Sequence, residues 1–207
     1  EKARVKAMTR RSFKTSVYIM APLMMGLAFV AEPLISLILT DKWLPCVPFL
    51  RIFCITYMFR PIHTANLNAI KALGRSDLFL KLEILKKTVG VILLLSTMWF
   101  GVMAMAYSLL VSTIASQIIN SWPNRKLLGY SYLDQLKDIL PGIFLAVFMG
   151  FCVSFVELLG LPNILTLAIQ VVAGAVIYIA GSFILKLDSF QYLFGIIKPV
   201  IVKILKK

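Results

Sequence analysis

A succession of apolar runs, each close to twenty residues long and separated by short polar breaks, constrains this chain more than any other feature. The hydrocarbon core of a bilayer is about 30 Å thick, and a helix of about 20 apolar residues crosses it. A soluble core would instead alternate apolar and polar faces along each element. Hydrophobic residues make up 60% of the sequence, against roughly 45–50% in soluble domains. The sequence therefore predicts an all-α integral membrane protein.

We expect three parts along the chain. A basic lead-in at residues 1–14 precedes a six-helix transmembrane lobe at residues 15–187, and a basic amphipathic tail follows at residues 188–207. The six expected transmembrane helices are residues 15–39, 45–72, 88–100, 102–119, 139–159 and 164–185. The third is short unless it begins earlier, with Lys86 and Lys87 reaching back to the interface. The tail is typical of an interfacial segment anchored to anionic lipid, and a frayed basic terminus is the alternative.

Lysine and arginine side chains are distributed unevenly between the two sides of the expected bundle. The six-helix topology puts four basic stretches on one side of the membrane. Of the 22 Lys and Arg residues, six lie in residues 1–14, five in residues 71–87, three in residues 125–137 and five in residues 186–207. The opposite side carries only Lys42. Because cytoplasmic loops are enriched in Lys and Arg, we expect the basic side, with both ends of the segment, to be cytoplasmic in a bacterial inner membrane. The net charge of +13 then indicates membrane lipids as partners rather than nucleic acid.

No residue pattern in the sequence indicates catalysis. There is one histidine, and the cysteines Cys46, Cys54 and Cys152 lack the spacing of a metal site. Their odd number does not indicate a disulfide framework. Neither a phosphate-binding P-loop nor a nucleophile-elbow motif is present. The breaks on the outer side are only a few residues long, which leaves little room for an active site. We therefore expect no enzyme activity, no metal and no cofactor.

Candidate binding residues gather in the expected second helix, whose apolar run contains the polar side chains Arg51, Arg60, His63, Asn66 and Asn68. A charged residue in the middle of a membrane costs at least about 2.5–3.5 kcal/mol on insertion scales. A water-filled cavity, a partner carboxylate or an anionic cargo can offset that cost. We therefore expect this helix to carry the functional site.

Helical spacing separates these five side chains. Arg60, His63 and Asn68 fall on one broad face of a helix. Asn66 lies further round, and Arg51 is about half a turn out of phase. We interpret Arg60 as the residue that faces an aqueous cavity and binds an anionic headgroup, because its planar guanidinium donates two hydrogen bonds at once. The alternative is that Arg60 bonds to a helix carbonyl or a carboxylate inside the bundle, and His63 is more readily interpreted as a packing residue than as a proton carrier.

Three passages resemble one family of membrane proteins: residues 19–52 (IMAPLMMGLAFVAEPLISLILTDKWLPCVPFLRI), residues 65–87 (ANLNAIKALGRSDLFLKLEILKK) and residues 99–114 (WFGVMAMAYSLLVSTI). The first holds Pro-Leu-Met-x-Gly-Leu, Glu-Pro-Leu-Ile and Lys-Trp-Leu-Pro, and the second holds Gly-Arg-Ser-Asp. Together they resemble the C-terminal half of bacterial polysaccharide flippases, the oligosaccharidyl-lipid exporters related to multidrug exporters of the MATE type. The resemblance extends over most of residues 1–190.

This resemblance implies two six-helix lobes around a central cavity, of which the chain supplies one. The implied function is transport of undecaprenyl-diphosphate-linked oligosaccharide across the cytoplasmic membrane during surface polysaccharide biosynthesis, by alternating access and without ATP hydrolysis. The implied partners are the lipid-linked oligosaccharide, an N-terminal lobe of the same protein and a polysaccharide polymerase. Either that lobe precedes Glu1 or two copies associate, and we favour the first because Glu1 begins inside what resembles a connector.

Two other functions are compatible with the same residues. A cation-coupled exporter of small molecules or drugs with the same fold would carry acidic residues at mid-membrane, but the expected helices offer only Glu32 and Glu157, both near their outer ends. A non-transporting membrane scaffold of a polysaccharide assembly complex is the other. The lack of carboxylates at mid-membrane favours the lipid-linked oligosaccharide as cargo.

Overall fold

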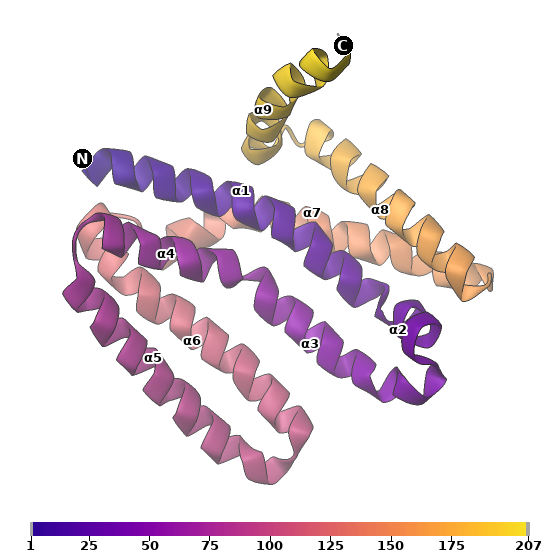
Figure 1. Ribbon diagram of the computed structural model, residues 1–207, viewed down its shortest axis with the longest axis horizontal. Coiled ribbons are helices and arrows are strands. Elements are labelled where there is room, and N and C mark those ends of the chain that lie inside the picture. Colours follow the sequence, from indigo (N-terminus) through magenta and orange to yellow (C-terminus); the bar gives the residue numbers. More distant parts are fainter. Residues whose placement is uncertain (1, 206–207) are drawn as a thin grey trace.

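Helices account for every regular element of the computed structural model, which describes residues 2–205 and the side chains of residues 2–196 (Figure 1). The α-helices in this part are α1 (Lys2–Phe29), α2 (Ala31–Leu39), α3 (Val47–Met58), α4 (Arg60–Ala72), α5 (Ser76–Thr97), α6 (Val102–Leu128), α7 (Tyr132–Ser154), α8 (Asn163–Ile184) and α9 (Asp188–Leu205). Short 3-10 turns at Asp41–Cys46, Met98–Phe100 and Phe155–Leu159 join α2 to α3, α5 to α6 and α7 to α8. The prediction of an all-α protein is confirmed for the described residues.

Five segments among the described residues are long and apolar enough to cross a membrane: Lys2–Phe29, Asp41–Ala72, Val102–Leu128, Tyr132–Leu159 and Asn163–Ile184. The helix α5 is not among them, because its first twelve residues include the charged residues Asp77, Lys81, Glu83, Lys86 and Lys87. It contains residues 88–97 of the third expected helix and forms a hairpin with α6 (Figure 1). The structure thus supports a multi-pass membrane protein, while the sixth transmembrane helix stays a prediction.

Proline residues accompany breaks in the first two expected membrane helices. Pro61 has no N–H and cannot continue the hydrogen-bond ladder, and the second expected helix divides at Phe59 into α3 and α4. The Ile62 N–H bonds to the Phe59 carbonyl at 3.2 Å beside this break. The first expected helix divides before Ala31, so that Pro33 lies in the first turn of α2, where its missing N–H costs little. Both expected helices are therefore bent rather than straight.

The connection expected at residues 121–138 is much shorter in the structure. The helices α6 and α7 extend toward each other and leave only residues 129–131 outside them. Gly129 ends α6 with φ +60°, a left-handed conformation that favours glycine. The Ser131 hydroxyl accepts from the Asp134 N–H, and the Asp134 carboxylate accepts from the Ser131 N–H, which caps α7. These local signals place the turn, whereas hydrophobicity alone makes the connection too long.

The central helix of the bundle is α1 (Figure 1). It packs along α7 and also contacts α3, α4 and α9. Its buried side chains form one core with those of α4 and α7: Phe13, Val17, Ala21, Met25, Ile62, Ala65, Ala146 and Met149. The helix α5 contacts mainly α6, so their hairpin extends from the bundle. This packing holds α4 beside α1, where the candidate site lies.

The close approach of α7 to the end of α1 gives a prediction about stability. A Cβ atom at Gly150 would overlap the Phe29 ring, whereas one at Gly142, on the same helix, would meet only the Tyr178 hydroxyl at 3.9 Å. Gly150→Ala should therefore lower the melting temperature of the intact protein in detergent, since overpacking costs about 1–3 kcal/mol. Gly142→Ala should be neutral or stabilising, because alanine favours helices by about 1 kcal/mol. Equal melting temperatures for the two variants would contradict this packing.

Candidate functional site

A polar groove lies between α1 and α4. Three α4 side chains, Arg60, Thr64 and Asn68, stand about one turn apart and are exposed along it. Ser12 and Ser16 line it from α1, and its volume is about 430 Å³. The polar groove thus presents a guanidinium, an amide and hydroxyl groups on two segments, Lys2–Phe29 and Asp41–Ala72, that are long and apolar enough to cross a membrane.

Arg60 lies well inside the segment Asp41–Ala72. Lys71, at the basic end of α4, follows eleven residues later, which is about 17 Å along a helix axis and about half of the 30 Å or so of hydrocarbon. The Arg60 carbonyl accepts a hydrogen bond from the Thr64 hydroxyl at 3.3 Å. Its guanidinium forms no ion pair with any described side chain. Arg60 is therefore available to an anion that enters the polar groove.

Arg51 is held elsewhere, on α3. Its guanidinium donates to the Glu32 carboxylate at 3.1 Å and to the Ala28 carbonyl at 3.2 Å. Both side chains of the ion pair are about half exposed, so it contributes only about 0–1 kcal/mol. The contacts join α3 to the bend between α1 and α2. The structure therefore separates Arg51 from the polar groove.

Asn66 points into the bundle rather than into the polar groove. Its amide oxygen accepts from Asn124 Nδ2 at 2.6 Å and from Gln135 Nε2 at 3.1 Å. Its own Nδ2 donates to Gln135 Oε1 at 2.9 Å. All three side chains are buried, and buried polar groups in folded proteins are normally hydrogen-bonded in this way. This amide cluster of Asn66, Asn124 and Gln135 ties α4 to α6 and α7.

His63 faces the α5–α6 hairpin. The Lys86 ammonium lies 3.3 Å from His63 Nε2, and the Asn120 amide lies 2.8 Å from Nδ1. An ammonium can only donate, so Nε2 is the acceptor in the contact with Lys86, and the atom that Asn120 places beside Nδ1 is its amide nitrogen. Lys86, itself buried, also donates to Glu83 at 2.5 Å. His63 therefore bridges α4, α5 and α6 and lies apart from Arg60 and Asn68.

The sequence pattern does not single out Asn120, Asn124 and Gln135. Asn120 and Asn124 stand four residues apart, and Gln117 precedes them by one turn, so polar residues at helical spacing are the available signal, although the expected fourth helix ends at residue 119. Gln135 gives no such signal, because the sequence alone places it in a connection between membrane helices. Its place beside Asn66 follows only from the packing of α7.

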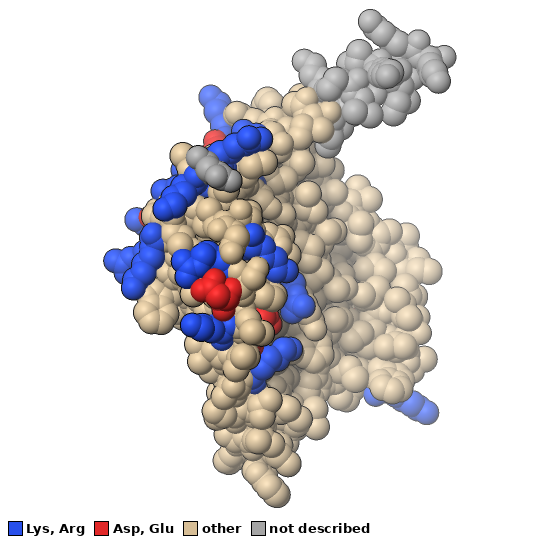
Figure 2. Space-filling model, turned by 60° about the vertical axis from the view of Figure 1, so that its left-hand side comes forward, with Lys and Arg blue, Asp and Glu red and all other residues tan. Residues whose placement is uncertain are grey.

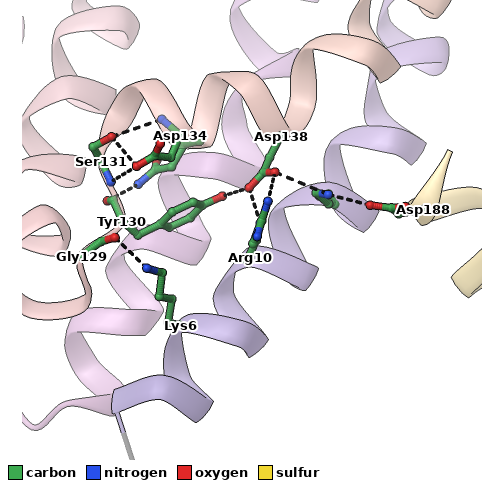
Figure 3. Close-up of polar contacts among 10 residues, drawn as sticks. Lys6, Arg10, Gly129, Tyr130, Ser131, Asp134, Asp138 and Asp188 are labelled. Carbon is green, nitrogen blue, oxygen red and sulfur yellow. Dashed lines mark hydrogen bonds and ion pairs between the residues drawn. The ribbon is translucent and has the colours of Figure 1, made fainter.

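Basic residues gather at one end of the molecule. Figure 2 shows Lys and Arg side chains over the end that carries the start of α1 and the α4–α5 and α6–α7 connections in Figure 1, while most of the other visible surface is uncharged. Arg10 donates twice to the Asp138 carboxylate, at 2.6 Å each (Figure 3). Tyr130 also donates to Asp138, at 2.8 Å, and Lys14 joins Asp138 to Asp188. This charged cluster of Arg10, Lys14, Tyr130, Asp138 and Asp188 fastens α1 to α7 and α9.

Two titratable groups outside the membrane-spanning segments keep their charge state near neutral pH. Burial raises the pKa of the Tyr130 phenol above its usual range, and the neighbouring Asp138 carboxylate raises it further. At the exposed start of α5, the hydrogen bonds from Arg75 lower the pKa of Asp77 to about 2. Tyr130 therefore stays a hydrogen-bond donor and Asp77 stays an anion throughout the physiological range.

Comparison with known proteins gives partial matches. Residues 1–48 match a family described as polysaccharide biosynthesis protein. The chain is 26% identical, over 90% of its length, to an uncharacterized membrane protein in the cps region of Klebsiella pneumoniae. It is 25% identical over its whole length to an uncharacterized membrane protein of Methanocaldococcus jannaschii. Over 76% of its length it is 24% identical to the teichuronic acid biosynthesis protein TuaB of Bacillus subtilis.

The matched relatives are much longer than the chain. It spans 39%, 40% and 34% of the Klebsiella, Methanocaldococcus and Bacillus proteins, respectively. No solved structure matches the chain. The chain is thus similar to membrane proteins and to proteins of polysaccharide biosynthesis. Together with the five apolar helical segments, this supports a multi-pass, all-α membrane protein.

Two asparagines two residues apart on α4 test the assignment of its faces. Asn66→Ala leaves polar groups of Asn124 and Gln135 buried without a partner, and each such group lowers the free energy of unfolding by about 1–3 kcal/mol. This variant should therefore lower the melting temperature of the intact protein. Asn68→Ala removes an exposed side chain and should change stability by no more than about 0.5 kcal/mol. Thermal unfolding in detergent, followed by size-exclusion chromatography, measures both. Equal losses for the two variants would show that the faces are assigned wrongly.

Proposed function

We propose that the chain is one lobe of a flippase that moves an oligosaccharide linked to undecaprenyl diphosphate across a bacterial cytoplasmic membrane. One observation carries this proposal: the polar groove exposes Arg60 about halfway into the membrane, without an ion pair to any described side chain. An arginine at that depth costs free energy, and an anionic cargo that enters the polar groove offsets it. The similarity to polysaccharide biosynthesis proteins supports a cargo made for surface polysaccharide.

A diphosphate has the chemistry that the polar groove can bind. The planar guanidinium of Arg60 donates two parallel hydrogen bonds to phosphate oxygens. Thr64, Asn68 and Ser16 offer hydroxyl and amide groups to the remaining phosphate oxygens or to the first sugar. No covalent bond breaks when a lipid-linked sugar crosses the membrane. The proposal therefore asks for binding and alternating access rather than for catalysis.

A groove that is open to one side needs a second surface to enclose its cargo. We propose that an N-terminal lobe of the same protein supplies it, since the matched relatives are much longer than the chain. The helix α5 then acts as the sixth transmembrane helix, because its 22 residues extend about 33 Å. In this topology the basic end of the molecule, with both ends of the segment, lies in the cytoplasm beside anionic lipids. A polysaccharide polymerase is the partner that would use the exported units.

Matched arginine variants of the intact protein test the proposal. Arg60→Gln keeps hydrogen-bond donors but removes the charge. We expect it to slow translocation of the lipid-linked oligosaccharide in reconstituted vesicles at least about tenfold, since a hydrogen bond to a charged group contributes about 1.5–3 kcal/mol. Arg51→Gln should retain transport, because Arg51 lies outside the polar groove. The amount of each variant in the membrane is measured alongside.

Three results would count against the proposal. Normal transport by Arg60→Gln would contradict the headgroup role of this residue. Drug export that depends on an ion gradient, with intact surface polysaccharide after gene deletion, would favour a cation-coupled exporter. Intact flipping in a deletion strain that fails to assemble polysaccharide would favour a membrane scaffold.

A further inference from the structure

A second groove, between α1 and α8, is apolar. Its volume is about 550 Å³. It is lined mainly by α1 and α8, with contributions from α7 and from Leu34 of α2. The residues used in the argument are Leu23, Gly26, Leu27, Met149, Gly174 and Ala175. This apolar groove begins on α1 where the polar groove ends.

The exposed face of α1 connects the two grooves. Ser12 and Ser16 line the polar groove, while Leu23 and Leu27 line the apolar groove. With Ile19, these residues recur at helical spacing along one stripe of α1, and Ile19 is exposed between the two pairs. In Figure 1, α4 and α8 lie on opposite sides of α1. A ligand whose head lies in the polar groove can therefore extend an apolar chain across Ile19 into the apolar groove.

The apolar groove offers contacts to hydrocarbon rather than hydrogen-bond donors. The Tyr178 hydroxyl donates to the Tyr18 carbonyl at 2.8 Å, and Gln170 Nε2 donates to the Val153 carbonyl at 3.2 Å. Close packing does not require glycine at Gly174, since a Cβ there would lie an ordinary 3.5 Å from Val153 Cγ1. The missing side chain instead leaves the groove open. A charged group would gain little in such a site, whereas an isoprenoid chain would lose unfavourable contact with water.

We infer that the apolar groove holds the isoprenoid chain of the same cargo whose diphosphate lies in the polar groove. The identity of that cargo rests on the proposed function. The lobe then binds both parts of an amphiphile: the charged head beside Arg60, and the chain between α1 and α8. Binding of the chain would favour long-chain carriers over short ones, independently of the headgroup.

Matched phenylalanine variants of the intact protein test this inference. Ala175 lines the apolar groove, and Ala180, on the same helix, does not, although both are exposed. The probes are undecaprenol and undecaprenyl diphosphate, each with a photoreactive diazirine in the chain. We expect Ala175→Phe to reduce cross-linking of both probes about tenfold, or about 1.4 kcal/mol, because the ring fills the groove. Ala180→Phe should leave cross-linking unchanged.

A second variant fills the apolar groove from α1. A Cβ at Gly26 would meet Met149 Cε at 3.7 Å, an ordinary contact, so Gly26→Leu should fold and should reproduce the loss of cross-linking. Equal cross-linking by Ala175→Phe and Ala180→Phe would overturn the inference. So would displacement of the undecaprenol probe by an equal amount of phosphatidylglycerol, which would identify an ordinary bilayer lipid as the occupant.

The Arg60→Gln variant separates this inference from the proposed function. It should weaken cross-linking of the diphosphate probe and leave the undecaprenol probe unaffected. If it affects neither probe, while Ala175→Phe reduces cross-linking of both, the headgroup site is wrong and the chain site stands. If Arg60→Gln weakens only the diphosphate probe and Ala175→Phe affects neither, the headgroup site stands and the chain site is wrong.

Discussion

Inside a bilayer, a polar side chain must find a partner within the protein or line a wet cavity, because lipid offers it no hydrogen bonds. The helix α4 uses both solutions. Asn66 and His63 are partnered by α5, α6 and α7, whereas Arg60, Thr64 and Asn68 remain exposed on the side of α1. The buried contacts fix the rotation of α4 about its axis, and that rotation directs the exposed set into the polar groove. The site therefore depends on an amide cluster that lies outside the groove.

The other wall of the site is α1, whose position is fixed along its length. At its basic end, the charged cluster fastens it to α7 and α9. In the middle, Phe13, Val17 and Ala21 pack in the common core. Because the polar and apolar grooves both open along α1, its placement sets the width of each. The charged cluster, the core and the two grooves are thus parts of one arrangement around a single helix.

Whether a feature can be predicted from the sequence depends on how local its cause is. Helical content follows from the length of the apolar runs, the break before α4 from Pro61, and the shared face of Arg60 and Asn68 from helical spacing. The partners of Asn66 lie up to 69 residues away, so its place in the amide cluster depends on how α6 and α7 pack. The same holds for Arg51, whose partner lies 19 residues earlier across a bend. Spacing along one helix cannot supply contacts that neighbouring helices make.

The most direct test of the account is whether water and cargo reach the polar groove. Thr64→Cys would be made in the intact protein with Cys46, Cys54 and Cys152 replaced, and labelled from the cytoplasmic side with a thiol reagent that does not cross membranes. Ala69→Cys, on the same helix, serves as the buried comparison. We predict that residue 64 is labelled, that undecaprenyl diphosphate slows its labelling, and that residue 69 is not labelled. No labelling at residue 64, or labelling that undecaprenyl diphosphate leaves unchanged, would contradict it.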